Sequence, residues 1–171
     1  MPSTASSLAL PSGSVLELSS ARAEWLAAGA ELDVGCAPVN ERGARALARA
    51  AVEARGAHAG RATECTLALG AGLVVVRLLR LPQLKRAELA LVLERKAAAW
   101  LDAPVGDVLY QASEMGALDA DEPSGERTWL VTAARRGELV ALRQELRRAG
   151  FAPRRIVPAQ LAALDCARAA L

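Results

Sequence analysis

The sequence predicts a domain of the mixed α/β or α+β class, and three observations support this. Short runs rich in leucine and β-branched residues, typical of strands, alternate with segments whose apolar residues recur at helical spacing. Prolines and glycines separate these segments. The stretch from Leu73 to Gln111 holds the clearest series, with a strand, a proline turn, a long helix, a second proline turn and another strand.

The composition is that of a globular chain with nearly balanced charge. The chain has 171 residues, of which 53% are hydrophobic, and this is enough to bury a core. The 21 basic and 19 acidic residues give a net charge of +2, which excludes a strong electrostatic attraction to nucleic acid. No apolar run has the length that spans a membrane, and the first residues lack the features of a secretion signal. We therefore expect a cytoplasmic protein.

Histidine and cysteine residues predict neither a catalytic site nor a metal site. His58 is the only histidine, and it lies among small residues without a nucleophile or an orienting partner nearby in the sequence. Cys36, Cys65 and Cys166 are far apart and form no CxxC pair, so neither zinc nor a disulfide framework is indicated. We expect three reduced, buried cysteines and no cofactor.

The first part of the chain predicts a meander of strands followed by a helix. Ser14–Ser19 and Arg22–Ala28 have the partial alternation of a hairpin, and Ala30–Val34 extends it. Asn40 is placed to cap a helix that runs to about Arg55, because its side chain can accept a hydrogen bond from a free backbone amide. The residues predicted to face inward on this helix are Gly43, Leu47, Ala50, Ala51 and Ala54.

A strand at Glu64–Leu69 leads into the central stretch. Gly70-Ala71-Gly72 has the spacing of a phosphate loop, but no helix follows it, so we predict a hairpin turn. Leu73–Leu81 is apolar except for Arg77 and Arg80, and we predict an interior strand that ends at Pro82.

The central helix is predicted from about Leu84 to Leu101. Its inward face consists of Leu89, Ala90, Leu93, Ala97, Trp100 and Leu101. Leu91 and Val92 fall outside this face and are predicted to point outward beside charged residues. Two explanations stay open for this pair: a neighbouring element buries them, or they form a docking site for another protein.

The rest of the chain continues to alternate. We predict strands at Val105–Gln111, Arg127–Ala134 and Phe151–Val157, helices at Arg136–Ala149 and from Pro158 onward, and an acidic surface loop at Glu114–Gly125. Asp102 and Asp107 flank a proline turn, where we expect them to cap backbone amides. A basic end is formed by Arg135, Arg136, Arg143, Arg147, Arg148, Arg154 and Arg155. We interpret it first as a solvated surface, then as a protein contact, then as a contact for nucleic acid, because it lacks aromatic residues for base stacking.

Several of these segments together resemble a known family. The matching residues are Leu81-Pro82, Glu94, Trp100, Pro104, Val131–Arg135, Ala149-Gly150-Phe151, Pro153 and Val157-Pro158. Their order and spacing resemble the type IV pilus assembly protein PilM and the cytoplasmic domain of the type II secretion protein GspL, which belong with FtsA to the actin-like group. The resemblance covers roughly Leu67 to Leu164 and, less closely, the meander before it.

The resemblance implies the N-terminal half of an actin-like unit. It places a ribonuclease H-like sheet in residues 1–83, an inserted 1C-type subdomain rich in βαβ elements in residues 84–157, and a helix that returns to the first subdomain in residues 158–171. The second lobe, which helps to hold the nucleotide in PilM and FtsA, is expected to be absent. Ser12-Gly13-Ser14 is the one match to the first phosphate loop, and it has no carboxylate to hold magnesium.

The function that the resemblance implies is scaffolding without catalysis. We expect a cytoplasmic component of a pilus or secretion platform, peripheral to the inner membrane, that binds a PilN-like peptide or a GspE-like ATPase. The candidate contact residues are Leu81, Pro82, Leu91, Val92, Arg143, Arg147 and Arg154. Two alternatives stay open: an actin-like ATP-binding protein of the same family, and a small domain that binds a ligand or nucleic acid.

Overall fold

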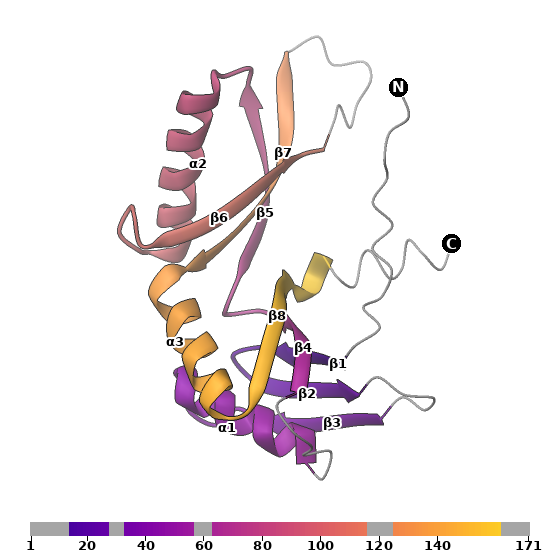
Figure 1. The fold of residues 1–171 in the computed structure, drawn as a ribbon. Coiled ribbons are helices and arrows are strands. Elements are labelled where there is room, and N and C mark those ends of the chain that lie inside the picture. The colour runs from indigo at the N-terminus through magenta and orange to yellow at the C-terminus, as the bar shows by residue number, and fades with distance from the viewer. Residues whose placement is uncertain (1–13, 28–32, 57–62, 116–124, 162–171) are drawn as a thin grey trace, which may run out of the picture. The chain divides into compact units, whose positions relative to one another are not determined.

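A computed structural model describes residues 14–27, 33–56, 63–115 and 125–161 of the chain (Figure 1). The chain divides into two compact units. The first unit comprises Met1–Gly70 and Arg143–Leu171, and the second unit comprises Ala71–Leu142. The second unit is thus inserted between two parts of the first.

The first unit is built on a mixed five-stranded sheet. Its strands are β1 (Ser14–Leu18), β2 (Arg22–Ala27), β3 (Asp33–Pro38), β4 (Thr63–Leu69) and β8 (Phe151–Pro158), in the spatial order β3-β2-β1-β4-β8. The first three strands pair antiparallel, whereas β1 with β4 and β4 with β8 pair parallel. This arrangement confirms the predicted sheet and the predicted hairpin, although β3 begins later than expected and includes Pro38.

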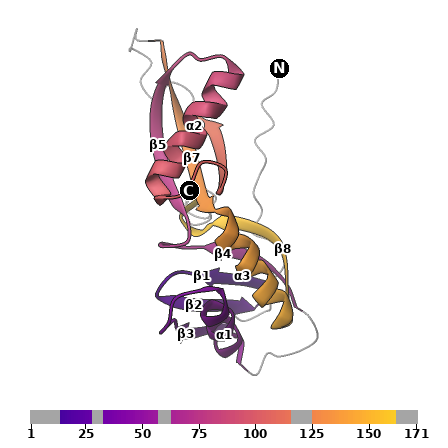
Figure 2. The same ribbon diagram turned by 90° about the vertical axis from the view of Figure 1, so that its left-hand side faces the viewer.

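Helix α1 (Ala44–Arg55) packs against β2 and β3 and buries a face of small residues (Figure 2). The buried residues are Leu47, Ala48, Ala50, Ala51, Ala54 and Arg55. The predicted cap at Asn40 is wrong, because the chain after β3 continues to Gly43, which precedes the helix with a φ of 112° and forms no side-chain cap. Arg55 is the unexpected residue among these buried residues, because it is charged.

Gly35 permits the close contact between β3 and α1. A Cβ atom at this position would lie 1.7 Å from the carbonyl oxygen of Ala54 in the helix. Glycine within a strand often marks such an approach of one backbone to another. The sequence pattern contains the glycine but does not reveal its partner, since α1 follows later in the chain.

Arg55 joins the end of α1 to the segment that enters β8. Its side chain is only 8% exposed, and its guanidinium carbon lies 4.3 Å from the ring centre of Phe151. Its Nη2 also donates a hydrogen bond of 3.5 Å to the carbonyl oxygen of Ala149. Trp25 completes the cluster, with its ring centre 5.6 Å from that of Phe151. A charged side chain therefore lies within the aromatic core of the first unit.

The described cysteines differ in their surroundings. Cys65 lies in the core, and burial raises the pKa of its thiol to about 11, while the charge of Arg55 acts in the opposite direction. Cys36 is exposed, so its predicted burial is wrong. Cys166 lies outside the described residues.

The second unit contains an antiparallel three-stranded sheet. Its strands are β5 (Val75–Pro82), β6 (Val108–Glu114) and β7 (Glu126–Arg135), in the order β5-β7-β6. Helix α2 (Arg86–Leu101) packs against β6 and β7, and α3 (Arg136–Arg148) begins in this unit and ends in the first. The hairpin predicted at Gly70-Ala71-Gly72 is wrong, because β4 and β5 belong to different sheets.

Polar contacts fix the end of α2 and the beginning of α3. Oδ1 of Asp107 accepts a hydrogen bond of 3.3 Å from the backbone amide of Gly137, which confirms its predicted capping role. Asp102 ends α2 through its backbone, which adopts the left-handed conformation with a φ of 48°. The side chain of Arg135 donates through Nη2 to the carbonyl oxygen of Leu101 at 2.5 Å. These bonds satisfy backbone groups that helix ends leave free.

The two units have different boundaries from the subdomains expected from the resemblance. The sequence placed boundaries after residues 83 and 157, whereas the structure groups β5 with the second unit and β8 with the first. The assignment of these parts to actin-like subdomains stays a prediction.

Replacing Gly35 with alanine tests the contact between β3 and α1. We expect Gly35→Ala to lower the free energy of unfolding by about 3 kcal/mol, because the helix backbone must move away from the strand. Denaturant titration measures this loss. Gly137→Ala serves as the control, because its Cβ would be 3.7 Å from the nearest atom, a carboxylate oxygen of Asp107. Equal stability of the Gly35→Ala variant and the wild type would contradict the packing described here.

Candidate functional site

Strand β5 is one of the two outer strands of the three-stranded sheet, and β6 is the other. Helix α2 covers β6 and β7, and in the described part of the chain no strand pairs with the outer edge of β5. The inner edge of β5 pairs with β7 over eight consecutive residues without a bulge. Its outer edge therefore presents a long, regular row of backbone amide and carbonyl groups.

The side chains of β5 alternate between a covered and an open face of the sheet. Leu79 and Leu81 contribute to the core beneath α2, together with Val131 of β7. Leu78 points to the opposite face, is 61% exposed, and is paired in register with Leu130. On the open face, Leu78 is therefore an apolar side chain at the middle of β5 that the sheet leaves uncovered.

Arg77 and Arg80 are exposed along the same strand. They lie three residues apart and so extend from opposite faces of the sheet. The prediction of an interior strand for Leu73–Leu81 is therefore wrong, because a central strand would bury at least one of these charges. The sequence did contain this signal, since an apolar run with arginine on both faces fits an outer strand better.

The outer strand β8 of the five-stranded sheet is less suited to pairing. It contains Pro153, which has no amide hydrogen, and its register with β4 shifts between Cys65 and Thr66. Proline and bulges on an outer strand hinder the addition of a further strand. These features are absent from β5 except for Pro82 at its last position.

The structure separates the predicted contact residues by exposure. Pro82 is exposed, and Leu91 is 55% exposed on the outer side of α2. Leu81 is buried, and Val92 is half-buried against the core that contains Leu81, Leu93 and Val131. The outward orientation predicted for Val92 is wrong, because α2 turns it toward the sheet. Whether any of these residues contacts a partner stays a prediction.

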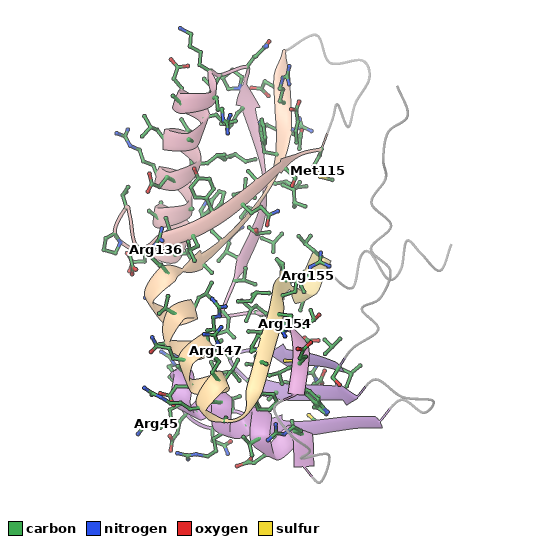
Figure 3. The ribbon with its side chains drawn as sticks, viewed as in Figure 1. Arg45, Met115, Arg136, Arg147, Arg154 and Arg155 are labelled. Atoms are coloured by element: carbon green, nitrogen blue, oxygen red, sulfur yellow. The ribbon has the colours of Figure 1, made fainter. Side chains whose placement is uncertain are left out.

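The predicted basic end, of which Figure 3 labels Arg136, Arg147, Arg154 and Arg155, is partly occupied by internal contacts. Arg154 forms an ion pair with Glu64, and this hydrogen bond and positive charge lower the pKa of the Glu64 carboxyl. Arg148 pairs with Glu145 at 2.5 Å. Arg143 and Arg147 are exposed on α3 and form no ion pair with another described residue.

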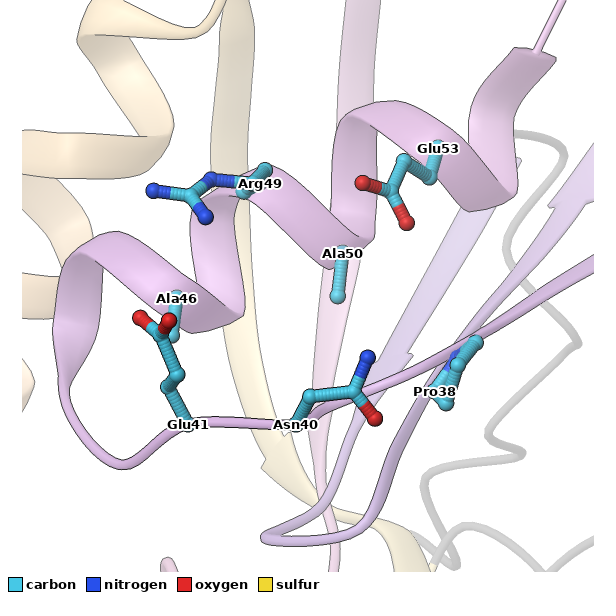
Figure 4. A pocket seen from close by; sticks show the side chains of 7 residues that line it. All are labelled: Pro38, Asn40, Glu41, Ala46, Arg49, Ala50 and Glu53. Atoms are coloured by element: carbon cyan, nitrogen blue, oxygen red, sulfur yellow. The ribbon is translucent and has the colours of Figure 1, made fainter.

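A small hollow lies between α1 and the segment formed by the end of β3 and the residues after it (Figure 4). It measures about 130 Å³ and is lined by Pro38, Asn40, Glu41, Ala46, Arg49, Ala50 and Glu53. Pockets that enclose ligands of drug size have about 300 to 1,000 Å³, so this hollow is too small to enclose a nucleotide. His58 and most of the Ser12-Gly13-Ser14 segment lie outside the described residues.

The described ranges lack two further features. Within these ranges, histidine, cysteine and carboxylate side chains form no group of three that could hold a metal ion. None of the helices described there has both the length and the apolar character needed to cross a membrane.

The fold is similar to that of two solved structures. One is the PilM-PilN type IV pilus biogenesis complex, with a TM-score of 0.59 and 18% identity over 93% of this chain and 51% of the matched chain. The other is the cytoplasmic domain of EpsL, an inner membrane component of the type II secretion system of Vibrio cholerae, with a TM-score of 0.56 and 22% identity over 85% of this chain and 56% of that one. The sequence matches no protein-family model and no curated protein.

These likenesses confirm, at the level of the fold, the resemblance that the sequence predicts. The chain spans about half the length of both matched chains. The two sheets and their helices confirm the predicted mixed α/β or α+β class.

Leu91 and Val92 offer a direct test of how α2 faces the sheet. We expect Leu91→Asp to change the free energy of unfolding by no more than about 0.5 kcal/mol, because the side chain is exposed. Val92→Asp should destabilise the protein by about 2 kcal/mol, because it places a charge against the core. Thermal and denaturant unfolding measure both. Equal losses for the two variants would show that Leu91 is also part of a core.

Proposed function

We propose that the chain is a non-catalytic scaffold of a type IV pilus or type II secretion platform, located in the cytoplasm and peripheral to the inner membrane. The fold likeness supports this proposal, because one matched structure is a complex of PilM with PilN and the other is the cytoplasmic domain of an inner membrane component. The exposed edge of β5 carries the proposal further, because it indicates how a partner would bind.

In this proposal an extended segment of a PilN-like partner adds a strand to the sheet at β5. Strand addition uses the free backbone groups of an outer strand for affinity and the alternating side chains for specificity. Leu78 offers an apolar contact on the open face of the sheet. Arg77 and Arg80 favour a segment with acidic residues, since opposite charges on neighbouring strands stabilise the pair.

A second copy of the chain is a poorer occupant of this edge. Pairing of β5 with another β5 would place two arginines from each copy along one junction. Like charges on adjacent strands destabilise the pairing. The arginines therefore disfavour self-association at the same edge where they favour an acidic partner.

Candidate contact residues outside β5 are proposed to bind a second protein partner of the platform. A GspE-like ATPase would need a surface apart from β5, and Leu91 on α2 is an exposed candidate. Leu81 can act only through the strand that it anchors, because its side chain is buried.

Substitution of Leu78 tests strand addition at β5. The probe is the cytoplasmic N-terminal segment of the PilN-like protein from the same organism, and fluorescence anisotropy measures its dissociation constant. We expect Leu78→Asp to weaken binding about tenfold or more, because a carboxylate replaces the apolar contact and repels acidic residues. Leu91→Asp is the matched control, since it makes the same change at an exposed leucine on α2. Weaker binding by Leu91→Asp alone would move the site to the helix.

Nucleotide binding tests the non-catalytic part of the proposal. We expect isothermal titration of the chain with ATP and magnesium to give no binding in the micromolar range, because Ser12-Gly13-Ser14, the one match to a phosphate loop, has no carboxylate to hold magnesium. Micromolar affinity that depends on magnesium would support the actin-like ATP-binding alternative and overturn the scaffold assignment.

A further inference from the structure

We infer that the first unit has a second binding surface, which attaches to the anionic headgroups of a lipid bilayer. We call it the arginine face, and it consists of Arg42, Arg45, Arg49, Arg143 and Arg147. All five side chains are exposed, and none forms an ion pair with another described residue. It is separate from the β5 edge, which belongs to the second unit.

Four residues of the arginine face lie on two helices at one side of the five-stranded sheet, and Arg42 lies two residues before α1. Helix α1 and the last turns of α3 lie on the same side of this sheet in both views (Figures 1 and 2). Arg45 and Arg49 are one helical turn apart, as are Arg143 and Arg147. Helix α1 buries the side opposite Arg45 and Arg49 through Leu47 and alanine residues, and all four arginines are exposed to solvent.

Arg55 holds the two helices in a fixed relation. It extends from the end of α1, donates to the carbonyl oxygen of Ala149 just after α3, and lies over the ring of Phe151. The guanidinium of Arg55 is buried and is held by a carbonyl oxygen and an aromatic ring, so its position is restricted. The arginines of both helices therefore belong to one compact unit, whose elements this contact joins.

The charges around this face leave it positive. Glu41 and Glu53 border the hollow beside Arg49, and Glu145 is already paired with Arg148. Two unpaired glutamates thus oppose five unpaired arginines. Guanidinium groups suit phosphate oxygens well, because their planar donors can bind two oxygens at once.

The apolar groups at this face favour a bilayer over nucleic acid. Val52 is 41% exposed on α1, one turn after Arg49, and can enter the boundary between headgroups and acyl chains. Nucleic acid binding commonly uses aromatic side chains that stack on bases. The aromatic residues described in the first unit, Trp25 and Phe151, are both buried.

Sedimentation with vesicles tests this inference on the full chain. The probes are vesicles of phosphatidylglycerol mixed with phosphatidylcholine, and vesicles of phosphatidylcholine alone, at about 0.1 M salt. We expect sedimentation with the anionic vesicles only, and its loss at 1 M salt. Each basic side chain near such a surface contributes about fivefold, so R45Q/R49Q and R143Q/R147Q should each weaken partitioning about 30-fold.

The control removes the same charge from a different surface. R95Q/K96Q changes two exposed basic residues on α2 in the second unit and should leave partitioning unchanged. Circular dichroism confirms that each variant is folded. Equal weakening by the control, equal sedimentation with both kinds of vesicle, or displacement by millimolar inorganic phosphate or by duplex DNA would overturn the assignment to a bilayer.

Discussion

Parallel pairing of β4 with β8 is the constraint on which the two-unit architecture depends. Two parallel strands cannot be joined by a tight turn, because the chain must return to the same end of the sheet before the second strand begins. Here that return occupies everything from Gly70 to Gly150, which includes the whole second unit. The first sheet is complete only when this long connection has brought Phe151 beside Thr63. The connection that must return from the end of β4 to the start of β8 thus contains a unit with its own core.

Arg55 shows how the first unit stabilises the end of this connection. Burial of a guanidinium is costly, and its Nε has no hydrogen-bond partner among the described groups. The cost is offset in part by the Phe151 ring and by the carbonyl oxygen of Ala149, which lie where the chain leaves α3 for β8. A purely apolar residue would pack against the ring but would leave that carbonyl oxygen without its donor. The charge therefore fixes the point at which the inserted unit rejoins the first sheet.

Local sequence patterns predicted the helices and strands of this fold better than they predicted which elements lie side by side. The faces of α1 and the strand order of the meander follow from residue spacing, which each segment contains by itself. The position of β5 at the edge of a sheet depends on which strands pair with it, and that information lies far along the chain. Arg77 and Arg80 were the local evidence for an outer strand, and the apolar residues around them outweighed it. Val92 was misplaced for a similar reason, since the sheet beneath α2 covers more of the helix than one stripe of apolar residues indicates.

The two proposed surfaces rely on different forces, and this makes them independent. Strand addition at β5 depends on directional backbone hydrogen bonds, and salt weakens only the share that comes from Arg77 and Arg80. The arginine face acts over longer distances, tolerates many orientations and weakens strongly as salt rises. A scaffold with both properties can be concentrated at an anionic surface through one unit and can select its protein partner through residues of the other unit. The second unit then supplies recognition while the first supplies location, and each can change in sequence without altering the other.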